Sequence, residues 1–327
     1  MSIYLGVDGG GTKTALCLVS EVGDVLAVMD APSCYYLGAD CTEGVSLVSR
    51  VLDEAVPALC ATAGTTPAQI AFAFFGLPAY GEVTTDLPLL DAAPRTALGH
   101  ARYRCDNDMV CGWAGSFALE DGINVISGTG SMSYGQRAEQ RVRVGGWGEL
   151  FGDEGSGYWI AVRGLQAFSR MSDGRLPAGP LLDVLRERLD LGSDLDVVDV
   201  VLNRWRGSRS DIAALSRQVV EAAQRGDNVA ARILTGAAAE LVLLIETACR
   251  NLGFTADEAV PVSYSGGVFS APEVLGRFEQ QLSRADRRYE LRTGRFPPVM
   301  GAALYAARLA GSPLSPAALE RLQATIT

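Results

Sequence analysis

Short apolar runs separated by glycine-rich turns dominate the beginning of the chain. Apolar residues 3–5 lead into 6–14, which holds three consecutive glycines, and a second apolar run occupies 15–19. A turn at 21–24 then precedes a third apolar run at 25–28. Runs of β-forming residues bounded by turn residues are typical of strands, so this pattern predicts a three-stranded meander with the glycine turn between its first two strands.

The same pattern returns later in the chain. Apolar residues 123–126 lead into the Gly-, Ser- and Thr-rich segment 127–135, which predicts another strand, glycine turn and strand. Further strands are expected at 71–75, 260–264 and 288–291, with a third glycine turn at 265–269. Two such units, each opening one half of the chain, indicate a duplicated α/β fold with one nucleotide between the halves.

Helical spacing of apolar positions characterises most of the remaining sequence. Helices are expected over 40–62, 109–119, most of 160–250, and 299–309. The run 229–249 is long and apolar, but Arg232, Glu240 and Glu246 interrupt it. It therefore predicts a core helix of a soluble protein rather than a membrane span.

Composition narrows the class of protein. Of the 327 residues, 48% are hydrophobic and 20% charged, which is typical of a soluble globular chain long enough for two domains. The net charge of −10 argues against a nucleic-acid or membrane partner. The seven cysteines are scattered without metal-ligand spacing, and no signal peptide is recognisable. A cytoplasmic protein with reduced thiols is expected.

The chemistry of the first glycine turn suits an anion. Glycines allow a tight turn whose backbone N–H groups approach a phosphate, while Asp8 adds a carboxylate and Lys13 a cation. A P-loop is excluded because Thr12 separates Gly11 from Lys13 and a strand pattern, not a helix, follows. On this stretch alone, an ordinary glycine-rich hairpin remains an alternative.

Several motifs together resemble a known family. They are DGGGTKT (8–14), GLPAYGE (76–82), ND (107–108), ISGTGS (126–131) and GGWGELFGDEGSGYW (145–159). Over nearly the whole chain, the sequence resembles the BadF/BadG/BcrA/BcrD-type ATPases, in particular their N-acetylglucosamine kinase branch, within the sugar kinase/actin/heat-shock ATPase superfamily. The resemblance implies a two-domain, duplicated ribonuclease-H-like (actin-like ATPase) fold with a nucleotide cleft between the domains. The expected domains are 1–119 and 120–311, with a C-terminal helix at about 312–327 able to pack back on the first.

The resemblance also implies roles for individual residues. Asp108 is expected to be the general base, with Asp106 as the competing candidate, and Asp8 to orient Mg²⁺ through water. The residues expected to bind ATP are Gly10, Gly11, Thr12, Lys13, Gly128, Thr129, Gly130, Gly266 and Gly267. Those expected to contact the sugar are Ser33, Cys34, Tyr35, Gly76, Asp108, Trp147, Gly148, Asp153 and Glu154.

Three of these assignments have alternatives. The stem of Lys13 can equally point to solvent, and Trp147 can be a core residue. Cys34 departs from the family pattern, in which an asparagine contacts the sugar, and a thiol replaces an amide poorly. The preferred sugar therefore stays open.

The expected function is that of an ATP- and Mg²⁺-dependent kinase acting on the 6-hydroxyl of N-acetylglucosamine or glucosamine, as a homodimer. N-acetylmannosamine, N-acetylmuramate and glucose are further candidate substrates. One alternative is an ATPase activator of a radical acyl-CoA dehydratase or reductase, which needs cysteines such as Cys105 and Cys111 for a [4Fe–4S] cluster across a dimer. Another is a non-catalytic sugar or nucleotide sensor.

Overall fold

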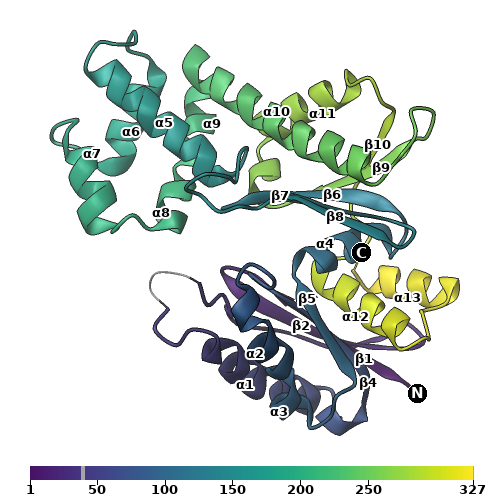
Figure 1. The fold of residues 1–327 in the computed structure, drawn as a ribbon. Coiled ribbons are helices and arrows are strands. Elements are labelled where there is room, and N and C mark those ends of the chain that lie inside the picture. Colours follow the sequence, from purple (N-terminus) through teal and green to yellow (C-terminus); the bar gives the residue numbers. More distant parts are fainter. Residues whose placement is uncertain (38–40, 327) are drawn as a thin grey trace. The chain divides into compact units, whose positions relative to one another are not determined.

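The computed structural model describes residues 1–37 and 41–326. The chain forms two compact units, Met1–Asp121 with Thr293–Thr327, and Gly122–Arg292. Each unit contains a five-stranded mixed sheet with helices packed against it (Figure 1). The predicted α/β class is confirmed.

The first sheet is built on the predicted meander. Strands β1 (Ile3–Gly9), β2 (Lys13–Ser20) and β3 (Val25–Pro32) pair antiparallel in sequence order. β4 (Ile70–Leu77) lies parallel to β1 on its other side, and β5 (Tyr103–Asn107) lies parallel to β4. The sheet order is therefore β3-β2-β1-β4-β5, with the carboxyl ends of β1, β4 and β5 at the same edge.

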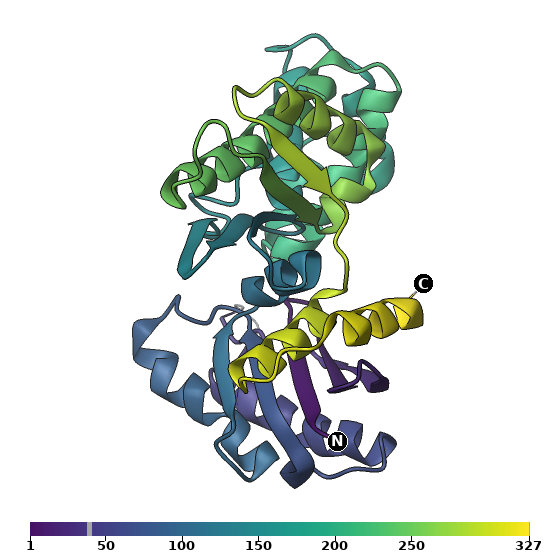
Figure 2. The same ribbon diagram turned by 90° about the vertical axis from the view of Figure 1, so that its right-hand side faces the viewer.

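Helices bury both faces of this sheet. Leu16 and Leu18 of β2 belong to the core cluster formed with α1, whereas Cys17 and Val19 belong to the cluster formed with α12. Successive side chains of a strand point to opposite faces, so the two helices cover opposite sides. Figure 2 shows α12, in yellow, crossing the strands of this sheet, and it packs against β1, β2 and β4. The helices of this unit are α1 (Ser46–Thr62), α2 (Leu87–Ala92), α3 (Pro94–Leu98), α4 (Met109–Phe117), α12 (Pro298–Leu309) and α13 (Pro316–Ile326).

Three boundaries in this unit differ from the sequence prediction. Helix α1 begins at Ser46 rather than at residue 40, which lies outside the described residues, as does residue 327 of the expected C-terminal helix. Helix α4 ends at Phe117 because Ala118 and Leu119 adopt left-handed φ angles of 50° and 73°. Residues 293–311 were assigned to the C-terminal domain, but α12 packs against β1, β4 and α4 of the first unit.

The second unit repeats the topology of the first. Strands β6 (Gly122–Ser127), β7 (Ser131–Arg137) and β8 (Gln140–Gly145) form an antiparallel meander. β9 (Val260–Ser265) pairs parallel to β6, and β10 (Tyr289–Arg292) pairs parallel to β9. A meander followed by two parallel strands in both units is the duplicated ribonuclease-H-like arrangement that the family resemblance implied.

The long apolar helix α10 (Asn228–Asn251) is part of the second core. Its carboxyl-terminal half packs against all three strands of the meander, as Figure 1 shows, and Leu241 and Ile245 are fully buried there. Its length and composition alone would also suit a membrane span, but those buried positions make it a core helix, as predicted. The other helices of this unit are α5 (Gly157–Ser172), α6 (Pro180–Leu189), α7 (Asp196–Asp199), α8 (Arg209–Ala214), α9 (Ser216–Gln224) and α11 (Pro272–Ser283).

Candidate functional site

The first glycine turn joins two paired strands. Pairing of β1 with β2 ends at Gly9 and Thr14, and the Gly10 N–H donates to the Lys13 carbonyl at 2.9 Å. Gly11 and Thr12 are exposed at the tip. A strand follows the turn, so the exclusion of a P-loop is confirmed.

Lys13 is engaged outside the turn. Its Nζ lies 2.8 Å from Oδ2 of Asp30 on β3, and both side chains are more than half exposed. An exposed ion pair of this kind contributes little to stability and exchanges readily for another partner. A contact of Lys13 with ATP stays a prediction.

The segment containing Ser33, Cys34 and Tyr35 braces this turn. The Ser33 hydroxyl donates to the Gly10 carbonyl at 2.7 Å and accepts from the Tyr35 N–H at 3.1 Å. The Cys34 thiol is fully buried, and a Cβ on Gly9 would lie 2.8 Å from its sulfur. The thiol thus fills the space behind the turn, while Ser33 ties the expected sugar segment to the expected phosphate segment.

Asp8 and Asp108, two carboxylates with predicted roles, lie at the edge where β1, β4 and β5 end. Asp8 of β1 is paired with Gly76 of β4, and Gly76 is paired in turn with Asp106 of β5. Asp108 follows at the start of α4, and its N–H donates to the Leu77 carbonyl at 3.3 Å. A Cβ on Gly76 would overlap the sulfur of a buried cysteine and lie 3.1 Å from the Asp108 Cα, so glycine lets the loop approach.

Asp8 has an unusual environment for a carboxyl group. Burial raises its pKa to about 6, against the lowering effects of a hydrogen bond from the Cys111 thiol and of the Lys13 charge. Oxygen donors with few protein ligands suit Mg²⁺, which keeps much of its water and takes phosphate oxygens. Among the described residues, no group of three or more metal-binding side chains occurs. Asp8 is therefore suited to a magnesium ion held chiefly by water and nucleotide.

The second glycine turn is joined to the start of α5. Its own Gly128 N–H donates to the Gly130 carbonyl at 2.9 Å. The N–H groups of Gly157 and Tyr158 donate to the carbonyls of Gly128 and Thr129 at 2.8 and 3.3 Å. These bonds hold the carbonyls toward the helix.

The third glycine turn lies against the second. Gly266 has φ of +99°, and a Cβ there would overlap the Ser127 carbonyl oxygen and lie 3.0 Å from the Gly128 nitrogen. Gly267 opens the short 3₁₀ helix Gly267–Ser270. Two segments predicted to bind different parts of ATP thus come together within the second unit.

The loop before α5 contains the remaining predicted sugar contacts. Trp147 is 73% exposed, so core packing is excluded, and Gly148 has a positive φ of 89°. Asp153 is only 3% exposed, and its carboxylate pairs with Arg209, a residue that sequence reasoning did not single out. Glu154 is half-buried and its carbonyl accepts a hydrogen bond from the Ser131 hydroxyl at 2.6 Å.

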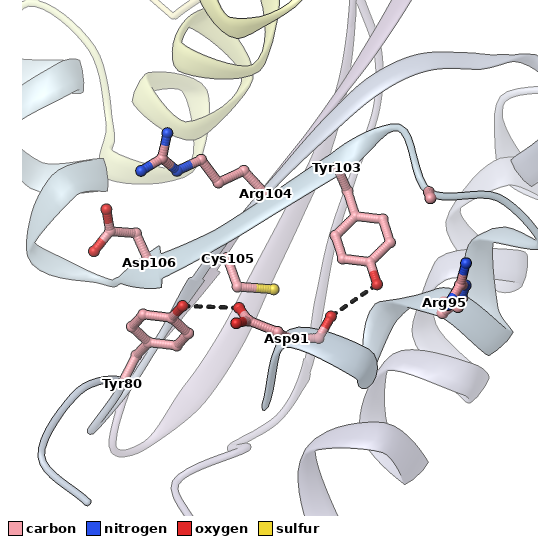
Figure 3. A pocket seen from close by; sticks show the side chains of 8 residues that line it. Tyr80, Asp91, Arg95, Tyr103, Arg104, Cys105 and Asp106 are labelled. Atoms are coloured by element: carbon pink, nitrogen blue, oxygen red, sulfur yellow. Dashed lines mark hydrogen bonds between the residues drawn. The ribbon is translucent and has the colours of Figure 1, made fainter. Parts of the chain in front are cut away.

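A shallow groove of about 690 Å³ follows the edge strand β5, but its lining does not indicate a ligand-binding site (Figure 3). Its polar groups satisfy one another: the Tyr80 hydroxyl donates to the Asp91 carboxylate at 2.8 Å and the Tyr103 hydroxyl to the Asp91 carbonyl at 2.7 Å. Arg104 and Asp106 project from the opposite side of the strand to Tyr103, as Figure 3 shows. The groove does not include the glycine turns.

The cysteine pair considered for an iron–sulfur cluster is internal. Cys105 and Cys111 are 5% and 0% exposed, and burial raises the pKa of both thiols well above its usual range. A cluster shared between subunits needs exposed thiolates. Neither side chain meets that requirement.

Comparisons with known proteins identify the family of this chain. A model of the BadF/BadG/BcrA/BcrD ATPase family matches residues 5–306. The chain is 31% identical to the N-acetylmuramic acid/N-acetylglucosamine kinase of Clostridium acetobutylicum, covering 83% of this chain and 86% of that one. It is 30% identical to the N-acetyl-D-glucosamine kinase of Dictyostelium discoideum, covering 93% and 97%.

Solved structures share the fold. A Chromobacterium violaceum protein provisionally described as an N-acetylglucosamine kinase matches with a TM-score of 0.73 at 24% identity, covering 95% of this chain and 99% of that one. The ROK hexokinase of Thermus thermophilus matches with a TM-score of 0.55 at 20% identity, covering 94% and 99%. Both matches span the two units.

Proposed function

The chain belongs to the BadF/BadG/BcrA/BcrD ATPase family, and we propose that it is an ATP-dependent sugar kinase that phosphorylates the 6-hydroxyl of N-acetylglucosamine or glucosamine. The curated relatives named as N-acetylglucosamine kinases, aligned over most of their length, support the substrate class. The observation that carries the chemistry is the position of Asp108. It lies at the sheet edge where Asp8 and the first glycine turn also lie.

Phosphoryl transfer needs positioning and charge stabilisation more than covalent chemistry. In the proposed mechanism, a carboxylate oxygen of Asp108 accepts the proton of the attacking hydroxyl, a role worth about 10²–10⁴-fold in rate. Phosphate oxygens are bound by Thr12, Thr129 and those backbone N–H groups of the two glycine turns that are not bonded within the turn, whereas the Gly10 and Gly128 N–H groups close the turns themselves. Asp8 would hold Mg²⁺ through water, and the ion would supply charge neutralisation at the phosphates.

Sugar recognition is assigned to two segments. Trp147 offers an exposed apolar surface for a sugar ring, as aromatic side chains present broad, rigid contact area. Asp153, Glu154 and the peptide groups at Gly148 supply polar partners for hydroxyl and acetamido groups. The segment with Ser33 and Tyr35 contributes on the side of the first turn.

A variant pair tests the assignment of the base. Asp108→Asn should bind ATP normally in calorimetry and lose at least about 10²-fold in kcat, because only the proton acceptor is removed. Asp106→Asn is the matched control, since Asp106 is also half-buried and its carboxylate accepts from the Asn107 N–H at 2.8 Å. Loss of turnover in Asp106→Asn with turnover retained in Asp108→Asn would reassign the base.

The alternative activator function is tested by iron. Purification without oxygen should give a colourless protein with no stoichiometric iron, because Cys105 and Cys111 are buried. A brown, iron-rich preparation would instead identify an activator. A sensor would bind sugar and ATP with no turnover of either.

A further inference from the structure

Arg209 pairs with two carboxylates beside the second glycine turn. It lies at the start of α8, and its guanidinium bonds to the Asp153 carboxylate. Its Nε lies 3.2 Å from Oε2 of Glu149. Asp153 is almost fully buried and Arg209 is about two-thirds buried, so this is an internal contact rather than a surface pair.

The pair also touches the glycine turn itself. A Cβ on Gly130 would lie 2.5 Å from the Arg209 Nη2 and 2.7 Å from the Asp153 Oδ2. The Asp153 carboxylate additionally accepts a hydrogen bond from the Ser131 N–H. The absence of a side chain at Gly130 is therefore what allows guanidinium and carboxylate to lie against the turn.

Two hydroxyl bonds join the same segments. The Ser127 hydroxyl donates to the Gly155 carbonyl at 2.9 Å, and the Ser131 hydroxyl donates to the Glu154 carbonyl at 2.6 Å. They tie both ends of the glycine turn to the chain just after Asp153. Arg209 adds a charged contact from the start of α8.

The charge of Asp153 depends on Arg209. Burial raises the pKa of the Asp153 carboxyl and Glu149 raises it further, whereas the Arg209 charge and the Ser131 N–H lower it. The Tyr158 phenol is a further titratable group beside this cluster, since burial and Glu149 raise its pKa and Arg209 lowers it. Removing the arginine would leave a buried carboxylate without a counter-ion, which is costly.

We propose that Arg209 is a positioning residue for sugar phosphorylation, one that holds the Asp153 carboxylate against Gly130 and so fixes the sugar-recognition loop 145–154 to the phosphate turn 127–131. The roles given to loop and turn rest on the proposed function. The physical coupling between loop and turn does not rest on that function. Arg209 acts through Asp153 and touches neither substrate.

Kinetics of Arg209→Gln test the role. The KM for the sugar should rise about tenfold or more, because a charge-assisted bond that orients its acceptor is lost, while the KM for ATP stays within about threefold. The acid limb of kcat/KM for the sugar should move to higher pH, since the pKa of Asp153 rises without its counter-ion. Arg209→Lys should recover part of the loss. Arg204→Gln is the matched control, because Arg204 pairs with Asp199 on the exposed surface and should change neither constant.

Hydrogen exchange without substrate tests the coupling independently of the function. In Arg209→Gln, amides of 127–131 and of 153–158 should exchange faster together, and Arg204→Gln should match the wild type. If the wild type phosphorylates no sugar but this joint change is seen, the function fails and the coupling stands. A rise in the KM for ATP alone would make Arg209 a phosphate ligand and overturn the proposal, as would unchanged kinetics in a folded variant.

Discussion

Replacing Asp8 with asparagine should stabilise the protein while weakening its use of magnesium. The folded-state pKa of Asp8 is about 6, above the ordinary 3.8, chiefly because of burial. A carboxyl group whose pKa is raised by folding favours the folded state fully below its unfolded pKa and loses that contribution as pH rises through the folded pKa. Between pH 4 and pH 7, ionisation of Asp8 therefore lowers the free energy of unfolding.

The size of the effect follows from the shift. The difference between about 6 and 3.8 in the pKa of Asp8 corresponds to roughly 3 kcal/mol at 1.36 kcal/mol per unit. The Asp8 side chain retains some solvent exposure, so about 1–3 kcal/mol is expected for Asp8→Asn at pH 7.5. Little difference is expected at pH 4, where the wild-type carboxyl is already largely protonated.

Urea unfolding of both proteins at pH 4 and pH 7.5, without Mg²⁺, measures this difference. Asp106→Asn is the control, since Asp106 lies at the same sheet edge on β5, with β4 between it and the strand of Asp8. In ATP titrations, Asp8→Asn should lose most of the gain that Mg²⁺ gives the wild type. If Asp8→Asn is instead less stable than the wild type at pH 7.5, the ionised carboxylate makes net favourable contacts and the reasoning is wrong.

Three further substitutions test single contacts. Gly266→Ala should lower the free energy of unfolding by about 1–3 kcal/mol and weaken ATP binding in calorimetry. The reason is that its Cβ would overlap the Ser127 carbonyl at a φ of +99°. Normal ATP affinity would remove Gly266 from the nucleotide site. Ser33→Ala removes the 2.7 Å bond to the Gly10 carbonyl. It should lower the free energy of unfolding in urea by about 1 kcal/mol and raise the KM for ATP. An unchanged KM would mean that the bond does not shape the turn. Trp147→Ala should leave stability within about 0.5 kcal/mol because Trp147 is 73% exposed, yet raise the KM for the sugar; an unchanged KM with a large loss of stability would contradict a binding role.

Local signals made the first meander, the β6–β7 hairpin and the long helix predictable. The glycine turns at 9–11 and 128–130 lie between strongly β-forming runs. Asp227 precedes α10, where its carboxylate accepts from the N–H groups of Val229 and Ala230. Strand β8 was not predicted because its polar and apolar residues are all at least partly exposed, so no buried run marks it. These outcomes depend on neighbours close in sequence.

Features that depend on contacts between residues far apart in the sequence were not predicted. Helix α12 packs closely on β1 at Gly6, where a Cβ would overlap the helix backbone, and so belongs to the first unit. Arg209 looked like any surface arginine, since its partner Asp153 lies on a separate loop. The packing of the Cys34 thiol behind Gly9 was likewise not foreseen, and its contact with the sugar stays a prediction. No periodicity encodes contacts of this kind.

Release of ADP in the presence of candidate sugars tests the central claim most directly. Wild-type protein with Mg²⁺-ATP should release ADP stoichiometrically with N-acetylglucosamine or glucosamine, and NMR of the product should place the new phosphate on the 6-oxygen. N-acetylmannosamine, N-acetylmuramate and glucose serve as comparison substrates. ADP release that is the same with and without every sugar, or a phosphate on another oxygen, would contradict the proposed function.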